Sequence, residues 1–160
     1  MTSESVSATI TIKARAEAIF LVLTDPSTHP AIDGTGRVLE ALDRERLTAS
    51  GQIFRMAMYH ENHWNPDRRY QMANRVRAFD APHAISWEPG QESDDGSLQF
   101  GGWVWRYDLT PVDPSTTEVT LSYDWSAVPE VVRRRQISWP PFPPAHLDDS
   151  LAHLAGLVTA

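Results

Sequence analysis

The chain has 160 residues, which fits a single domain over residues 1–160, and it carries a formal net charge of −7. Its lack of cysteine excludes disulfides, thiol nucleophiles and cysteine-ligated metal sites. The acidic balance disfavours nucleic acid and anionic membrane surfaces as partners, and no apolar run approaches the roughly 20 residues of a membrane span.

The first part of the chain indicates a strand followed by two short helices. Residues 6–13 alternate between apolar and polar side chains, which is typical of a strand with one buried face. The alanine-rich residues 14–23 carry apolar side chains at helical spacing. This helix is predicted to end at Asp25-Pro26, because the residue before a proline is forced out of the helical region. A second short helical turn is predicted over residues 27–32.

Further strands are predicted over the middle of the chain, separated by loops rich in proline, glycine, aspartate and asparagine. The strands are predicted at residues 37–42, 53–60, 69–79, 83–88, 103–109 and 118–126. The loops between them include residues 65–67, 80–82, 89–96 and 112–115. Strands at hairpin spacing with helices held to the two ends predict an α+β fold with an antiparallel sheet.

The C-terminal stretch combines a proline-rich approach over residues 140–144 with an amphipathic helix. The helix is indicated by one apolar stripe at helical period, formed by Leu147, Leu151, Leu154 and Val158. We expect this stripe to cover the apolar face of the sheet. A helix of about 15 residues spans only ~22 Å, so it leaves part of the sheet uncovered.

The chain resembles the START-like helix-grip superfamily, and in particular its polyketide cyclase/dehydrase-like (SRPBCC) branch. The resemblance rests on four tracts, which are residues 6–26, residues 76–87, residues 103–121 and Phe142-Pro143-Pro144 with residues 151–154. It implies a START/Bet v1-like fold, with two short helices after the first strand and a curved seven-stranded antiparallel sheet around the C-terminal helix. It also implies an apolar cavity between sheet and helix. It does not fix the ligand, because the branch includes aromatase/cyclases as well as lipid and hormone carriers.

The strand faces that the alternation turns inward are rich in aromatic residues and methionine, which is typical of a pocket for a flat or hydrophobic molecule. The predicted ligand-binding residues are Met56, Met58, Tyr70, Asn74, Trp87, Trp103, Trp105, Tyr123, Leu151 and Leu154. The predicted acid–base residues are His60 and Tyr107, which a cyclase or dehydratase would use. The alternative is that these side chains simply fill a core.

Other charged and polar features are predicted to have no role in chemistry. Arg133-Arg134-Arg135 is interpreted as a solvated charge run, and His146, Asp149 and His153 as a solvated helix flank. No metal site is predicted at residues 60–63, since neighbouring residues of a strand point to opposite faces.

Three functions remain open from the sequence. The leading hypothesis is a binding domain for a hydrophobic or aromatic, polyketide- or lipid-like small molecule. The second is a polyketide cyclase/aromatase or dehydratase, and the third is a stress-type or protein-interaction module of the same fold. We expect no cofactor and no metal, and either a monomer or a homodimer. We also expect a cytoplasmic location, because residues 1–5 carry no signal-peptide pattern.

Overall fold

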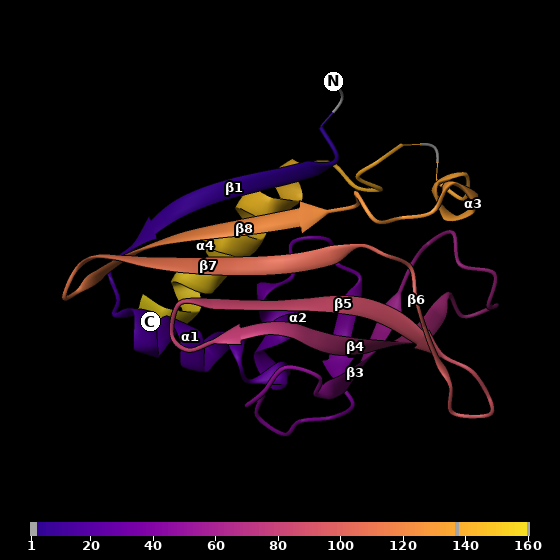
Figure 1. Ribbon diagram of the computed structural model, residues 1–160, viewed down its shortest axis with the longest axis horizontal. Helices are drawn as coiled ribbons and strands as arrows, with labels where there is room; N and C mark the ends of the chain where they lie inside the picture. The colour runs from indigo at the N-terminus through magenta and orange to yellow at the C-terminus, as the bar shows by residue number, and fades with distance from the viewer. Residues whose placement is uncertain (1–2, 137, 160) are drawn as a thin grey trace.

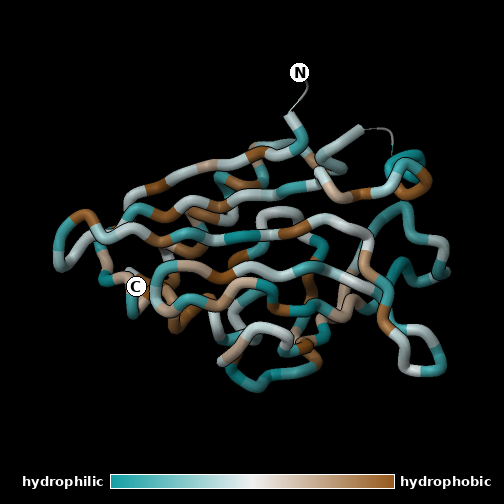
Figure 2. Tube along the Cα trace, viewed as in Figure 1, coloured by the Kyte–Doolittle hydropathy of each residue, from teal (hydrophilic) through white to brown (hydrophobic). Residues whose placement is uncertain are grey.

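Strands form where apolar and polar side chains alternate along the sequence, as the colours along the chain in Figure 2 illustrate. The computed structural model describes residues 3–136 and 138–159. Its strands are β1 Ser5–Ile12, β2 Val38–Ala41, β3 Ile53–Tyr59, β4 Arg69–Asp80, β5 Ala84–Glu92, β6 Leu98–Phe100, β7 Val104–Asp113 and β8 Thr116–Asp124. Its helices are α1 Ala16–Leu23, the 3-10 turn η1 Pro26–Thr28, α2 His29–Ile32, α3 Glu130–Arg133 and α4 Ala145–Thr159.

The strands form one antiparallel sheet in the order β1-β8-β7-β5-β4-β3-β2, with β6 paired to β5 beside this path. Figure 1 shows α4 crossing one face of the sheet, behind β1, β8 and β7, and α1 and α2 lie on the same side. We call this the inner face. The predicted α+β fold and the predicted seven-stranded antiparallel path are therefore confirmed, and β6 is a short addition.

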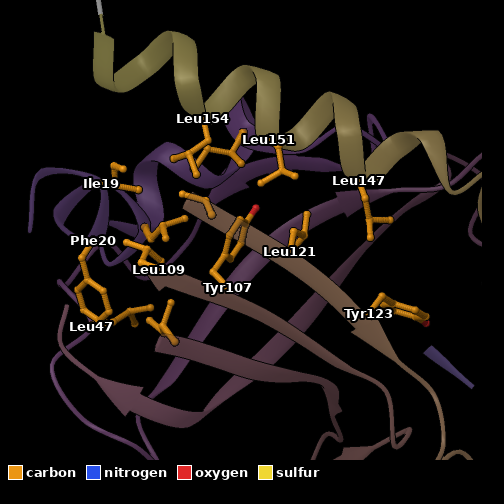
Figure 3. Close-up of a cluster of buried hydrophobic side chains, with 14 of the residues drawn as sticks. Ile19, Phe20, Leu47, Tyr107, Leu109, Leu121, Tyr123, Leu147, Leu151 and Leu154 are labelled. Carbon is orange, nitrogen blue, oxygen red and sulfur yellow. The ribbon is translucent and has the colours of Figure 1, made fainter. Parts of the chain in front are cut away.

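The apolar stripe of α4 packs against the sheet as predicted. Leu147, Leu151 and Leu154 are at most 1% exposed, whereas Val158 near the end of the helix is half-buried. Figure 3 shows the three leucines pointing from α4 toward Tyr107 and Leu121, which lie on β7 and β8. The spacing of the leucines brings them to one side of the helix, because residues four and seven apart share a helical face.

The predicted loop at residues 89–96 is wrong at its start, since β5 continues through Pro89 and Gly90. β7 pairs with β5 only as far as Trp87, and β6 begins to pair at Gly90. Pro89 lies at this change of partner strand, a position that tolerates a residue without an N–H. Gly90 is required, because a Cβ atom there would lie 2.6 Å from the ring of Phe100.

The solvated-charge interpretation is wrong for Arg133, which ends the short helix α3. Its guanidinium donates to the carbonyl oxygens of Val128 at 2.9 Å and Trp125 at 3.0 Å, and it pairs with Glu4. It therefore fixes the turn after β8, whereas Arg134 and Arg135 are exposed.

The α4 flank that was predicted as solvated is exposed at Asp149 and His153, and it also helps to hold α2 and the following loop against the helix. His153 donates a hydrogen bond through Nδ1 to the carbonyl of Ile32 at 3.1 Å, and the hydroxyl of Ser150 accepts the N–H of Gly34 at 2.8 Å. The ring of His146 stacks on Phe142. Asp149 is exposed, and among the described residues it makes neither a side-chain hydrogen bond nor a ring contact of this kind.

None of the helices within the described residues has the length and apolar character needed to cross a membrane.

Candidate functional site

The inner face divides into a fully buried part and a half-exposed part. Under α4, the sheet residues Tyr107 and Leu121 are at most 4% exposed. Elsewhere on the inner face, large side chains stay half-buried, and we call this set the aromatic wall: Met58, Tyr70, Trp87, Trp103 and Trp105. Every member of the aromatic wall is among the predicted ligand-binding residues.

Strand pairing builds the aromatic wall. Trp87 lies opposite Trp105 on β7, and Trp105 lies opposite Tyr123 on β8. Directly opposed residues of antiparallel strands point to the same face with their Cβ atoms about 5 Å apart. Toward the β2 edge of the sheet, Met58 on β3 lies opposite Tyr70 on β4 in the same way. The predicted grouping of these side chains follows from the registers.

The remaining predicted ligand-binding residues are buried, on the inner face of the sheet or on α4. They are buried members of the interior rather than half-exposed ones: Met56, Asn74, Tyr123, Leu151 and Leu154. Tyr123 joins the two parts, because its ring lies 4.6 Å from that of Trp105.

His29 was not among the predicted site residues, and its side chain covers part of the inner face of the sheet. This residue of α2 is 8% exposed, and its ring stacks on Trp87 at 5.0 Å and meets Phe54 edge-on at 5.5 Å. Its Nε2 donates to the carbonyl of Leu23 at 2.9 Å. Burial lowers the pKa of His29, so the ring is neutral in the folded protein at neutral pH.

The buried neutral His29 predicts a loss of stability in acid. The unfolded chain takes up a proton at a pKa of about 6.5, whereas the folded chain resists protonation to lower pH. This stabilising contribution is complete above pH 6.5 and is lost as the pH falls toward the folded-state pKa. As the pH falls from 7 to 5, we expect protonation of His29 in the unfolded chain to lower the free energy of unfolding by up to about 2 kcal/mol.

Urea unfolding at the two pH values measures this loss for the wild type and for His29→Gln, which keeps a hydrogen-bond donor. The variant is expected to lose less stability than the wild type over the same interval. Equal losses in the two proteins would contradict a buried, neutral histidine.

The proline-rich segment before α4 covers one end of the aromatic wall. Phe142, 7% exposed, stacks on Trp105 at 5.4 Å and meets Tyr123 edge-on at 5.0 Å. Trp139 packs on Trp103 with their ring centroids 6.2 Å apart. The sequence showed only a proline-rich approach to the helix, and its aromatic contacts with the sheet are a finding of the tertiary structure.

The loop between α2 and β2 places an arginine beside this segment. The carboxylate of Asp33 accepts the backbone N–H groups of Thr35, Arg37 and Val38, which holds the loop in a tight turn. The Nη2 of Arg37 donates to the carbonyl oxygen of Pro141 at 3.2 Å. Its guanidinium therefore lies next to the residue that precedes Phe142.

The two predicted acid–base residues occupy different environments. His60 follows β3 directly, and its Nδ1 accepts the N–H of Asn62 at 3.0 Å, while burial and the charge of Arg37 lower its pKa. Tyr107 is buried, and burial raises its pKa, so its hydroxyl stays protonated at neutral pH. Figure 3 shows this hydroxyl directed toward α4. Within residues 3–136 and 138–159, no hydrogen bond joins the two side chains.

Two of the hollows on the described surface lie outside the space between the sheet and α4. One has a volume of about 470 Å³ and is lined by residues 138–144. The other has a volume of about 280 Å³ and is lined by residues 42–45 and 52–55. The cavity between sheet and helix therefore stays a prediction.

Comparison with solved structures finds the same fold in proteins of low sequence identity. A START superfamily protein from Mycobacterium smegmatis matches with a TM-score of 0.62 and 17% identity, and the match covers 97% of each chain. Protein Ms6760 from the same species matches with a TM-score of 0.68 and 15% identity, over 98% of this chain and 92% of that one.

A point mutant of norcoclaurine synthase from Thalictrum flavum, in complex with a transition-state analogue, has a TM-score of 0.63 and 13% identity. That match covers 99% of this chain and 95% of the synthase. No family model and no curated protein sequence matches the chain. The fold is the START/Bet v1-like helix-grip fold, as the sequence predicts.

Proposed function

We propose that this protein binds a hydrophobic or aromatic small molecule against the aromatic wall, between the sheet and the N-terminal end of α4. The supporting observation is that large apolar side chains remain half-exposed on the inner face of the sheet. Concave apolar surface rimmed by a few polar groups is the usual composition of a small-molecule site.

The arrangement of the rings suits a flat molecule. Trp87 and Trp105 lie opposite each other on neighbouring strands, and the buried Phe142 stacks on Trp105 at one end of the wall with an interplanar angle of 17°. A planar ligand stacked on the wall gains both apolar burial and the offset contacts that aromatic pairs favour. We infer a polyketide- or lipid-like ligand, because the aromatic wall is apolar and suits a flat molecule.

The fold comparisons support binding only by analogy. A norcoclaurine synthase of this fold holds a transition-state analogue, but a fold hosts many functions, so the argument for binding rests on the wall itself.

Titration with N-phenylnaphthylamine, a neutral aromatic dye that fluoresces in apolar sites, tests the proposed function. We expect saturable dye fluorescence together with quenching of tryptophan emission, because Trp87, Trp103 and Trp105 belong to the wall. Tyr70→Ala is expected to weaken dye binding by about fivefold, since loss of an aromatic contact removes roughly 1 kcal/mol.

Tyr59→Ala is the matched control. Tyr59 neighbours Tyr70 in the same β3–β4 hairpin, but it is 38% exposed and alternates to the other face from Met58. Its removal is expected to leave dye affinity unchanged. Absence of saturable binding to the wild type, or equal loss in both variants, would refute binding at the aromatic wall.

A further inference from the structure

We propose that the ligand of the aromatic wall carries an acidic group, a carboxylate or a sulfonate, that the guanidinium of Arg37 binds. This inference rests on the proposed function and names the chemical class of its ligand. It is carried by the position of Arg37 beside Pro141 and Phe142 and by the lack of an acidic partner for Arg37 among the described residues.

Arg37 stands apart from the other half-buried arginines of the described chain. Those arginines pair with a carboxylate, in the pairs Arg55–Asp43, Arg75–Glu88 and Arg133–Glu4. The side chain of Arg37 instead donates to one neutral acceptor, the carbonyl oxygen of Pro141. A guanidinium has five N–H donors in a planar fork that matches a carboxylate, so most of its donors stay available to a ligand.

The charge of Arg37 acts on the candidate site itself. It opposes the rise in pKa that burial causes at Tyr70 and Tyr123, and it lowers the pKa of His60 further. Tyr70 belongs to the aromatic wall, and Tyr123 contacts both Trp105 and Phe142. The positive charge therefore acts at the same rings that would hold the aromatic body of the ligand.

The acidic side chain in the same loop as Arg37 is already committed to the backbone. Asp33 shares the loop with Arg37, and its carboxylate accepts N–H groups from Thr35, Arg37 and Val38 as well as the hydroxyl of Thr35. Those bonds orient it toward the turn, where it shapes the loop and makes no ion pair with Arg37 in the described chain. An anion on the ligand would supply the missing counter-charge.

The imidazole of His146, which follows the proline-rich segment over residues 140–144, has a nitrogen without a hydrogen-bond partner in the described chain. The Nδ1 of His146 is buried and has no hydrogen-bond partner among residues 3–136 and 138–159. The His146 ring stacks on Phe142 at an interplanar angle of 10° and a centroid distance of 5.9 Å. Buried polar atoms are normally satisfied, so an unpaired one beside a candidate site is a feature that a polar ligand group can meet.

The test compares two dyes that share one aromatic frame and differ in a single anionic group. Anilinonaphthalene sulfonate carries a sulfonate, and N-phenylnaphthylamine lacks it. We expect the wild type to bind the sulfonate dye at least about tenfold more tightly, since a charge-assisted bond to arginine is strong in a half-buried site. This preference should decrease as salt concentration rises.

Arg37→Gln is expected to abolish the preference and to leave the affinity for the neutral dye unchanged. Arg37→Lys keeps the positive charge without the planar fork, so it should retain part of the preference. Arg44→Gln, which neutralises an exposed arginine, is the matched control and should keep the preference of the wild type. Unchanged affinity for the neutral dye shows that each variant is folded.

The inference and the proposed function fail in different ways. If the neutral dye binds but the wild type shows no preference for the sulfonate dye, the role of Arg37 is refuted while binding at the wall stands. The same conclusion follows if Arg37→Gln keeps the preference. If neither dye binds the wild type, the proposed function fails, and the inference fails with it.

Discussion

Replacing Leu154 by alanine is expected to lower the free energy of unfolding by about 3 kcal/mol, within the range measured for buried leucines. Leu154 is 0% exposed and points from α4 into the cluster of Figure 3. The substitution removes its apolar contacts and leaves a cavity that the packed sheet cannot fill. Urea unfolding followed by far-UV circular dichroism measures the loss.

Leu157→Ala is the matched control, since Leu157 lies in the same helix but is 41% exposed. We expect its free energy of unfolding to change by less than about 0.5 kcal/mol. Similar losses at both positions would contradict the orientation of α4 on the sheet.

The second large effect is expected at Gly34, where alanine should lower the free energy of unfolding by about 3 kcal/mol. A Cβ atom at this position would lie 2.3 Å from the carbonyl oxygen of His146 and 2.9 Å from the Cβ of Asp149. The main obstacle is backbone of α4, which cannot rotate away as a flexible side chain can. Relief therefore requires the loop to leave the helix and to break the hydrogen bond between Gly34 and Ser150.

Gly156→Ala makes the same chemical change within α4 and is expected to raise the free energy of unfolding instead. A Cβ atom there meets no heavy atom within 4 Å. Alanine favours a helix over glycine by about 1 kcal/mol, so this variant should be more stable than the wild type. Thermal unfolding of both variants checks the pair, and destabilisation of similar size in both would contradict the close contact at Gly34.

Gly34→Ala also reports on the site, because the loop that it displaces carries Arg37. We expect this variant to lose the preference for the sulfonate dye along with its stability. Leu157→Ala and Gly156→Ala should retain that preference.

Local patterns were sufficient to predict most of the elements. The alternation in residues 6–13 predicted β1, and the spacing of Leu147, Leu151 and Leu154 predicted both α4 and the face that it buries. Such patterns are reliable because a strand repeats every two residues and a helix every 3.6, whatever the partner element is. The prediction at Pro89 was wrong because a proline normally ends a strand, and only the change from β7 to β6 makes it tolerable there.

The sequence by itself therefore determined the α+β class, the order of the elements apart from β6 and α3, and the apolar character of the inner face, since each follows from local periodicity. It also predicted the members of the aromatic wall, because alternation assigns every second strand residue to one face. Only the tertiary structure decided which of these residues stay half-exposed, since that depends on what covers them. His29, Phe142 and Arg37 come from separate segments, and no periodicity links a loop or short helix to the strand that it meets.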